Sequence, residues 1–455
     1  MVRTIQTGNP SNPEKNTLLW QYRMEEKGSM DKYFWYLILI FLLGIFIVIF
    51  RNKSGRTQSE INFGNVFSGL FQIQTENRLL EKPFILKLKK LKDKWEYFLF
   101  KKVNIDDSFS GKEGYVFGED MTKSIFGDDY CGEAFIYDQV YKAAFVQKKL
   151  KESGVELLFL FAPGKASVYP EKLPDYLRKT KHKKTNYETY ITEGKNFNLN
   201  MIDFVQYFKT LKSQTPYPLF PKYGSHWSFY AECIVVDSTI RRLEQMTNVN
   251  LPNFNYTNVR LLDTVKFRDA DIFQKMNLEV PKGNLLAYPD KFTFEHGEDV
   301  HAQKVLGIGD SYYQCFQYTG AMHEAFGDGK QWYYYNSILP KDEKNPEVWE
   351  LDLKSELLGH KAILVLCNEL NLTLFGSGFI NEAYELFSNP EQYYDYKKDR
   401  DRVNYFRKEI HRNKDSLDLV ASESQRRRIS VDSLITEISL KKLAQEKLKK
   451  IESVD

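Results

Sequence analysis

The sequence predicts an α/β fold in which a parallel β-sheet is covered by helices on both faces. Short apolar runs of strand length alternate with segments of helical periodicity. Strands that are buried on both faces are apolar along their whole length, as most of these runs are. The expected strands are 156–161, 198–204, 304–308, 332–335 and 362–366. Helices are expected over 133–152, after His226 and after Ser311.

Length and composition bound the class of protein. A chain of 455 residues can hold one large domain with appendages, or two domains. A hydrophobic content of 42% and an aromatic content of 15% indicate a sizeable core rather than a disordered chain. The net charge of +3 gives no overall signal for nucleic-acid binding, and we expect no such partner. The four cysteines form no CxxC pair, so they predict no metal site and fit buried thiols or an extracytoplasmic disulfide.

An uncharged apolar run at 33–50 predicts a single transmembrane anchor. As a helix it would rise about 27 Å, close to the roughly 30 Å hydrocarbon core of a bilayer. Tyr33, Trp35 and Tyr36 cluster at one end, as side chains of an interfacial aromatic belt do. Basic residues flank both ends equally, so charge alone does not orient the anchor across the membrane.

The composition changes along the chain and predicts five segments. They are an N-terminal cytoplasmic tail (1–32), the anchor (33–50), a linker with a basic amphipathic helix (51–108), the globular domain (109–388) and a charged helical tail (389–455). The amphipathic pattern covers 83–102, where lysines alternate with an apolar 3.6-residue repeat. It fits a helix on the membrane surface or a lysine-rich helix packed on its own domain.

Two short motifs suggest chemistry. Ser311 lies in GDSYYQ at 309–314, between an apolar strand and an expected helix. There its backbone N–H and the helix dipole could stabilise developing negative charge, although such a tripeptide is also an ordinary helix cap. His226 lies in GSHWS, just before another expected helix. An unperturbed histidine titrates near pH ~6.5, so His226 could act as a general base toward a serine.

Three longer strings occur in a specific order. They are LFLFAPGKASVYPEKLP at 158–174, PLFPKYGSHWSFYAE at 218–232 and VLGIGDSYYQ at 305–314, preceded by EGYVFG at 113–118. This ordered set resembles the SGNH hydrolase-like domain of the alginate O-acetyltransferase (AlgX/AlgJ) family. The resemblance covers roughly residues 110–385.

The resemblance implies a fold related to SGNH esterases, permuted so that histidine precedes serine. Ser311 would be the nucleophile and His226 the general base, and the serine would form an acetyl-enzyme. No cofactor or metal is implied, because the acetyl donor would be supplied by a partner or an acetylated carrier. Family members commonly work beside a membrane-bound O-acyltransferase. The resemblance would therefore place the globular domain in the periplasm, anchored to the bacterial cytoplasmic (inner) membrane, with a polysaccharide as substrate.

The sequence departs from the family pattern at one position. The family often has Asp-x-His-Trp, and here Gly224 stands where the aspartate would be. Either His226 works with Ser311 alone, or a carboxylate from elsewhere orients the imidazole. The candidates for this carboxylate are Asp203, Asp269, Asp271 and Glu369. Asp269 and Asp271 fit loop-capping residues equally well.

Other residues could bind substrate or an oxyanion. Asn368 and Asn336 each follow an expected strand, where they could donate to an oxyanion or simply close a turn. Lys165 could bind an anionic sugar or brace its loop. Trp227 and Tyr312 suit sugar stacking and core packing alike.

Three functions fit these observations. The first is an O-acetyltransferase that modifies an extracytoplasmic polysaccharide. The second is an acetyl esterase of the same fold, which would resolve the acetyl-enzyme with water instead of a sugar hydroxyl. The third is a non-catalytic scaffold of a polysaccharide-modification complex. An anchor beside an acyl-donating partner favours transfer.

Overall fold

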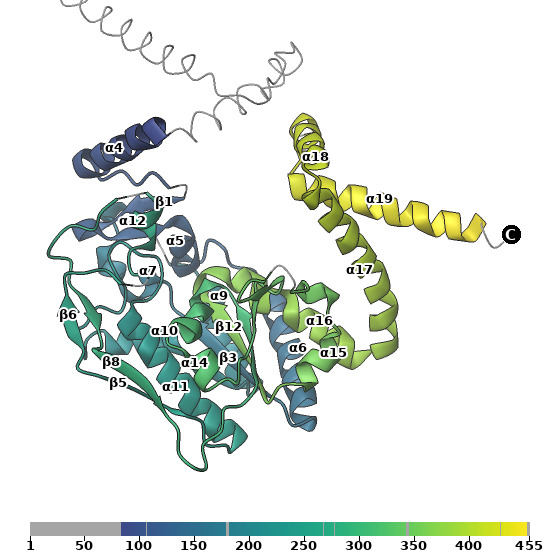
Figure 1. The fold of residues 1–455 in the computed structure, drawn as a ribbon, viewed down its shortest axis with the longest axis horizontal. Coiled ribbons are helices and arrows are strands. Elements are labelled where there is room, and N and C mark those ends of the chain that lie inside the picture. Colours follow the sequence, from purple (N-terminus) through teal and green to yellow (C-terminus); the bar gives the residue numbers. More distant parts are fainter. Residues whose placement is uncertain are drawn as a thin grey trace, which may run out of the picture. The chain divides into compact units, whose positions relative to one another are not determined.

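A six-stranded β-sheet forms the centre of the computed structural model, which describes residues 83–452 except 106, 179–181, 267, 277, 343–344 and 428 (Figure 1). The strand order is β11-β10-β9-β12-β3-β4. β11 is antiparallel to β10, and all other neighbours are parallel. The strands are β3 (Glu156–Ala162), β4 (Met201–Asp203), β9 (Val305–Gly309), β10 (Gln331–Tyr333), β11 (Ser337–Leu339) and β12 (Ala362–Asn368).

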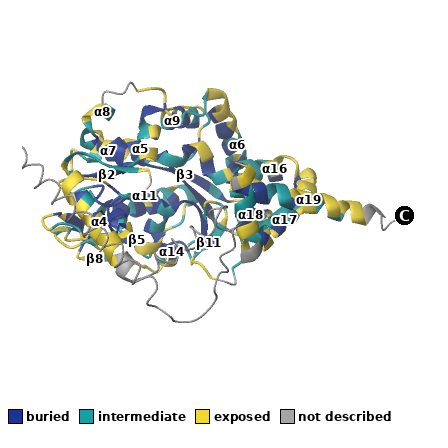
Figure 2. Cartoon of the chain, turned by 90° about the horizontal axis from the view of Figure 1, so that it is seen from above, coloured by how far each residue is buried: buried dark blue, intermediate teal, exposed yellow. Residues whose placement is uncertain are grey.

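Both faces of this sheet are buried, as Figure 2 shows by the dark colour of its centre. Along β3, Leu158 and Leu160 join one core cluster, while Leu157 and Phe159 join the other. This alternation follows from the two-residue period of a strand, and it explains the uninterrupted apolar run in the sequence. The predicted parallel sheet covered on both faces is confirmed.

Eleven helices of the described chain contribute side chains to these two cores, and one of them, α17 (Pro390–Arg412), adds only Tyr393 to the second. The first core takes side chains from α5 (Glu119–Phe126), α7 (Lys165–Val168), α10 (Phe204–Leu211), α11 (Phe229–Thr247), α13 (Cys315–Tyr318) and α14 (Ala321–Glu324). The second core takes them from α6 (Glu133–Glu152), α9 (Asn186–Asn196), α15 (Leu353–Leu358) and α16 (Phe379–Ser388). The α10 helix also places one valine in the second core.

Smaller elements surround the sheet. Antiparallel pairs form between β1 (Ser108–Ser110) and β2 (Val116–Gly118), β5 (Asn253–Thr257) and β8 (Lys291–Glu295), and β6 (Arg260–Leu262) and β7 (Leu286–Tyr288). Two further short helices are α8 (Asp175–Arg178) and α12 (Asp271–Lys275). The 3₁₀ segments are η1 (Lys112–Gly114), η2 (Pro170–Lys172), η3 (Ser311–Gln314), η4 (Val348–Glu350) and η5 (Glu369–Gly378).

Two strands are shorter than expected. The strand expected at 198–204 is reduced to β4 because Asp203 caps α10, its carboxylate accepting from the Gln206 N–H at 2.9 Å. β10 ends at Tyr333 because Tyr334 and Tyr335 adopt left-handed backbone, with φ of 48° and 54°. The antiparallel edge strand β11 and the small antiparallel pairs were not predicted.

The C-terminal tail is helical, as its apolar spacing predicted. It comprises α17 (Pro390–Arg412), α18 (Lys414–Arg427) and α19 (Val431–Glu452). Tyr393 fastens α17 to the domain, because its ring is buried and its hydroxyl donates to Glu382 at 2.9 Å. A small separate core of Ile410, Val420, Leu434 and Ile435 holds the three helices together.

The N-terminal side of the described chain begins with α4 (Pro83–Phe100), which matches the helix expected over 83–102. The expected tail (1–32) and anchor (33–50) lie outside the described residues. Among the helices that are described, none combines the length and the apolar character needed to cross a membrane. All four cysteines are free thiols.

Candidate active site

Ser311 sits at the carboxyl end of β9, where the chain turns back into η3. Asp310 caps this turn, its side chain accepting from the Tyr312 N–H at 2.9 Å. The ring of Tyr313 then folds over the strand, and only a glycine at 307 permits this. A Cβ at Gly307 would lie 2.0 Å from the Tyr313 ring. The glycine-rich run before Ser311 is therefore needed for the close packing that holds the serine at the sheet edge.

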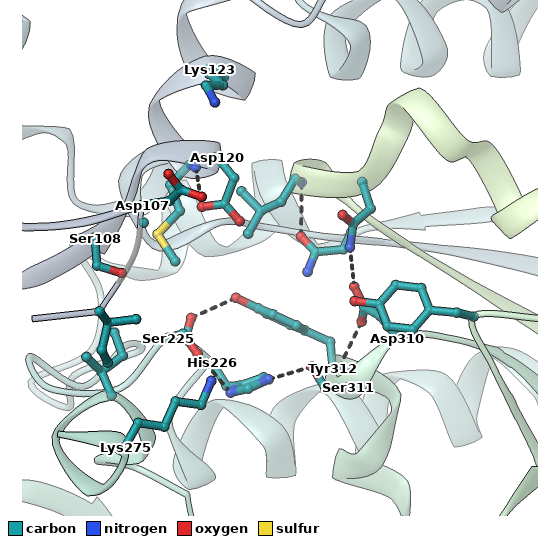
Figure 3. A pocket seen from close by; sticks show the side chains of 18 of the residues that line it. Asp107, Ser108, Asp120, Lys123, Ser225, His226, Lys275, Asp310, Ser311 and Tyr312 are labelled. Carbon is teal, nitrogen blue, oxygen red and sulfur yellow. Dashed lines mark hydrogen bonds between the residues drawn. The ribbon is translucent and has the colours of Figure 1, made fainter. Parts of the chain in front are cut away.

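Three side chains from separate segments form a hydrogen-bonded chain at this edge. His226 Nε2 lies 2.7 Å from Ser311 Oγ, as Figure 3 shows. On the other side of the ring, His226 Nδ1 lies 2.9 Å from Asp271 Oδ2. Ser225 secures the carboxylate further, because its N–H and hydroxyl donate to Asp271 at 2.7 and 2.6 Å. The structure thus brings together Ser311, His226 and one of the four candidate carboxylates.

Asp271 occupies the space that a side chain at position 224 would need. A Cβ built on Gly224 would lie 3.0 Å from Asp271 Oδ1 and 2.8 Å from Pro221 Cγ. An aspartate at 224 and the carboxylate of Asp271 therefore could not both fit here. Gly224 stands where the family often has an aspartate, and Asp271 of α12 supplies a carboxylate to His226 instead.

The electrostatics of the chain suit a neutral imidazole beside an ionised carboxylate. Burial lowers the pKa of His226, and the hydrogen bond to Asp271 opposes this effect. Burial would raise the pKa of Asp271, but hydrogen bonds from His226 and Ser225 outweigh it and hold this pKa well below its usual range. The ionised Asp271 accepts a hydrogen bond from the Nδ1–H of His226, which leaves Nε2 free to take a proton from Ser311.

Arg268 holds the turn of Ser311 from the same loop that carries Asp271. Its guanidinium donates to the backbone oxygen of Ser311 and to Gln314 Oε1. It also pairs with the buried Glu232 at 2.9 Å, and this ion pair opposes the rise in the pKa of Glu232 that burial causes. Sequence reasoning missed Arg268, Glu232 and Ser225. The one available signal was the run RDAD at 268–271, which places Arg268 three residues before Asp271.

A cavity of about 500 Å³ opens beside Ser311 (Figure 3). One wall comes from Asp107, Ser108, Asp120 and Lys123, near β1 and α5, and the opposite side carries Ser225, His226, Lys275 and Ser311. Further lining residues are Ile105, Gly118, Met121, Ile272, Asp310, Tyr312, Tyr333, Tyr334, Asn368, Leu370 and Asn371. Ser311 and His226 therefore face a space that can hold a small substrate or the end of a larger one.

The two candidate asparagines differ in position. Asn368 lines the cavity. Its side-chain oxygen accepts from the Leu370 N–H at 3.1 Å, and its side chain also forms a hydrogen bond with Asp310. Asn371, which was not predicted, donates to Asp310 at 2.8 Å. Asn336 is not at this site, because it lines a separate cavity beside Trp349 and α17. Asn336 lies in the turn between β10 and β11, where its backbone oxygen accepts from the Val348 N–H at 2.9 Å.

Lys165 and Trp227 are structural rather than substrate-facing. Lys165 is fully buried and its amine donates to the backbone oxygens of Val116 and Lys222, at 2.7 and 3.3 Å. Burial lowers its pKa to about 7. Trp227 is fully buried between Phe208 and Tyr312. Lys165 therefore braces its loop, and Trp227 packs in the core.

Tyr312 lies at the junction of core and site. It lines the cavity, and its hydroxyl donates to the backbone oxygen of Ser225 at 2.9 Å. Its ring centroid is 4.9 Å from that of His226. Tyr312 thus fixes the position of the segment that carries the histidine.

The other three candidate carboxylates lie away from His226 and have structural partners. Asp203 caps α10 and accepts from the Tyr187 hydroxyl at 2.9 Å. Asp269 accepts from the Phe229 N–H at 3.2 Å, and Glu369 accepts from the Gly164 N–H at 3.0 Å. Asp271 is the candidate that contacts the imidazole. Among the described residues, no group of three His, Cys, Asp or Glu side chains could hold a metal ion.

The fold and the geometry of this site together indicate a class of protein domain. A parallel α/β sheet carries a serine after one strand, and an oriented histidine reaches it at the carboxyl edge of the sheet, which is an arrangement typical of serine hydrolase-like domains. Residues 116–256 match the family model described as the SGNH hydrolase-like domain, acetyltransferase AlgX. The resemblance predicted from the sequence is therefore confirmed, because this part of the chain matches the model of that family.

Three solved structures are similar to the chain. The O-acetyltransferase domain of Pseudomonas putida AlgJ is 16% identical in sequence, with a TM-score of 0.39. The match covers 61% of this chain and 98% of the AlgJ domain. Pseudomonas aeruginosa AlgX has 12% identity, coverage of 61% and 69%, and a TM-score of 0.40. Bacillus cereus PatB1 has 11% identity, coverage of 53% and 91%, and a TM-score of 0.34. These TM-scores are low, so the resemblance to the AlgX family rests on the match to the family model. No curated protein matches the chain significantly.

Proposed function

We propose that this chain is an O-acetyltransferase that moves acetyl groups onto hydroxyls of an extracytoplasmic polysaccharide through an acetyl-enzyme at Ser311. The observation that carries the proposal is the unbroken chain of contacts from Ser311 Oγ through His226 to Asp271. The match to the acetyltransferase AlgX family model supports the choice of acetyl transfer. The apolar run at 33–50 supports a membrane anchor, with residues 109–388 as the acetyltransferase domain and 389–455 as an appended tail.

In the first half-reaction, Ser311 Oγ attacks the carbonyl carbon of an acetyl donor while His226 Nε2 takes the hydroxyl proton. The bond from acetyl to the donor oxygen breaks, and the donor leaves with the proton that His226 returns. In the second half-reaction a sugar hydroxyl gives its proton to His226 and attacks the acetyl-enzyme, and the proton returns to Ser311. Asp271 stays ionised and stabilises the imidazolium in both steps.

The oxyanion would be stabilised by the backbone N–H of Ser311 and by Asn368. An asparagine amide has two N–H donors, so an amide that bonds to Asp310 retains one for the cavity. Asn371 supports this arrangement by donating to the same carboxylate. The chain needs no cofactor for these steps. A membrane-bound O-acyltransferase, or an acetylated carrier, would supply the acetyl group on the periplasmic side of the inner membrane.

The test is an assay of the full-length chain with a chromogenic acetyl ester, with and without acceptor oligosaccharide. Acetyl release that depends on Ser311, with acetyl found on the sugar, is the expected result. Ser311→Ala should abolish release, whereas Ser388→Ala, at an exposed position on α16, should not change it. Free acetate with no sugar product would identify an esterase instead. Turnover that survives Ser311→Ala would exclude Ser311 as the nucleophile of either enzyme, whereas no acetyl release by the wild-type chain would leave the scaffold.

A further inference from the structure

The α4 helix packs on the domain through the side that carries Asp93 and Tyr97, and a cavity lined by Leu91, Phe98 and Leu278 opens along the edge of this contact. Asp93 and Tyr97 are its buried side chains in the described part of the helix, with 5% and 3% exposed. Asp93 accepts from the Asn104 side chain at 2.7 Å, and the Tyr97 ring meets Phe273 edge-on at 4.9 Å. This side of α4 is therefore held to the segment that follows the helix by a hydrogen bond, and to α12 of the domain by an aromatic contact.

The opposite side of α4 carries a stripe of exposed apolar side chains, which we call the α4 stripe. Its members are Leu88, Leu91, Trp95, Phe98 and Leu99. Their spacing of i, i+3, i+7 and i+10 or i+11 places them on one face of a helix. Exposure runs from 39% for Leu88 to 63% for Leu99. Side chains of this size usually face a core, so the α4 stripe indicates an interaction surface.

Lysines border the α4 stripe on both sides. At 3.6 residues per turn, Lys87 and Lys94 fall along one border and Lys92 along the other, while Lys89 and Lys90 lie further round the helix, and all five are exposed. The acidic residues of the helix are occupied elsewhere. Asp93 faces the domain, and Glu96 accepts from the Asn104 side chain at 2.5 Å and lies 3.5 Å from Lys92 and Lys102. The outer face of α4 is thus apolar in the middle and positively charged at its borders.

We propose that the α4 stripe binds an anionic phospholipid surface. The apolar side chains would enter the boundary between headgroups and acyl chains, and the lysines would meet the lipid phosphates. Trp95 suits this depth because its indole is amphipathic. The position in the chain favours a membrane over a protein partner, since α4 begins 33 residues after the predicted anchor ends at residue 50. A tether of this length keeps α4 near the bilayer. The inference therefore rests on the anchor in the proposed function.

The packed side of α4 connects this surface to the Ser311 cavity. Phe273, the partner of Tyr97, lies in α12 two residues after Asp271. The chain that leaves α4 reaches the rim of the cavity at Ile105, Asp107 and Ser108. A membrane-bound α4 would therefore hold the cavity rim close to the bilayer, where an acetyl donor delivered by a membrane protein would arrive.

The experiment places an environment-sensitive fluorophore on the full-length chain in liposomes. Leu91→Cys and Leu419→Cys are labelled separately in a Cys131→Ser background, because the other three native thiols are buried. Leu419 is the matched control, an exposed leucine on α18. In liposomes of phosphatidylglycerol and phosphatidylcholine, brominated acyl chains should quench the label at 91 about twofold and leave the label at 419 unchanged. Phosphatidylcholine alone, or Lys87→Glu with Lys90→Glu and Lys94→Glu, should weaken the quenching.

Equal, unquenched emission from positions 91 and 419 in anionic liposomes would overturn the proposal. So would a label at 91 that is shielded from aqueous iodide but not quenched by brominated lipid, because another protein surface would then cover the α4 stripe. Acetyl-ester turnover measured on the same samples reports on the Ser311 site separately. If the predicted anchor at 33–50 does not insert, the chain will not co-float with the liposomes in a density gradient.

Discussion

The turn that carries Ser311 and the loop that carries Asp271 meet at the same histidine but are held there by different forces. The Ser311 turn extends directly from β9 and is fixed by packing, with Tyr313 pressed onto Gly307. The loop that ends at Asp271 is fixed by polar contacts. These are Arg268 with Glu232, Asp269 with the Phe229 N–H, and Asp271 with Ser225.

This difference has consequences for mutation. A sheet-edge turn held by packing should respond to volume, because buried side chains leave little free space. A loop held by buried polar groups should respond to charge and protonation, because an unpaired buried group is costly. Changes in the turn should therefore appear mainly in stability, and changes in the loop mainly in activity and its pH dependence.

The largest effect is expected at the residue where the two segments meet. His226→Ala removes the base that we assign to Ser311, and kcat for acetyl-ester hydrolysis should fall by about 10⁴-fold or more. His323→Ala is the matched control, since His323 is exposed on α14 and pairs with Asp328. Activity within a few-fold of wild type in His226→Ala would rule out the assigned base.

Asp271→Asn should lower kcat/KM by about 10³- to 10⁴-fold, because an amide no longer stabilises the imidazolium or fixes its tautomer. Burial already lowers the pKa of His226, so the acid limb of the wild-type profile should lie below pH ~6.5. Loss of the carboxylate, which opposes that effect, should move the limb to still lower pH. Asp203→Asn serves as control, and a larger loss there than at 271 would reject Asp271 as the orienting residue.

Arg268→Lys keeps the charge but loses the fork that reaches both Glu232 and the Ser311 backbone. We expect kcat/KM to fall by about 10- to 100-fold, the equivalent of one or two charge-assisted hydrogen bonds, with little change in KM. Steady-state kinetics together with the melting temperature check this. A change in KM alone would show that Arg268 contacts substrate rather than positioning the serine.

Gly307→Ala tests the packed turn. The added methyl would overlap the Tyr313 ring, so the free energy of unfolding should fall by about 1–3 kcal/mol. Chemical denaturation measures this loss. Gly154→Ala controls for adding a methyl where there is open space, although its positive φ carries a cost of its own. Equal stability of Gly307→Ala and wild type would contradict the packing explanation.

Asp269→Asn should give an effect on stability that depends on pH. Burial raises the pKa of Asp269 to about 8, so the folded chain binds a proton that the unfolded chain releases near pH ~4. The stability contributed by this proton is present at low pH and is lost as the pH rises through about 8. The asparagine variant should therefore gain melting temperature relative to wild type between pH 5 and 8. A constant difference across this range would exclude a raised pKa.

Much of the fold followed from the sequence because buried parallel strands are apolar throughout. The runs at 156–161 and 362–366 correspond to β3 and β12, and the helix at 133–152 corresponds to α6. The edge strand β11 and the small antiparallel pairs were missed because strands of three to five residues are too short to show a clear period in the sequence. The end of β10 depends on the left-handed tyrosines, which nothing in the local sequence indicates.

Site residues that lie in local motifs could be predicted from the sequence. Residues on a loop that is distant in the sequence were harder to predict. Ser311 and His226 were singled out by local motifs and by order. Asp271 could be named only as one of four carboxylates, because its contact with His226 spans 45 residues. Arg268 and Glu232 gave no separate signal, since a buried ion pair cannot be told from surface charges without a fold. Asn336 was singled out as a residue at a strand end, but the turn between β10 and β11 places it against Val348 and a separate cavity.

The most direct test of the central claim is to trap the acetyl-enzyme. The full-length chain is mixed with a chromogenic acetyl ester, quenched in acid and digested with trypsin, and the peptide spanning residues 305–330 is analysed by mass spectrometry. The proposed mechanism predicts one added acetyl group on Ser311, absent in Ser311→Ala and lost from wild type when acceptor sugar is added before the quench. Ester turnover with no acetyl on this peptide, or with acetyl on another residue that turns over at the catalytic rate, would contradict it.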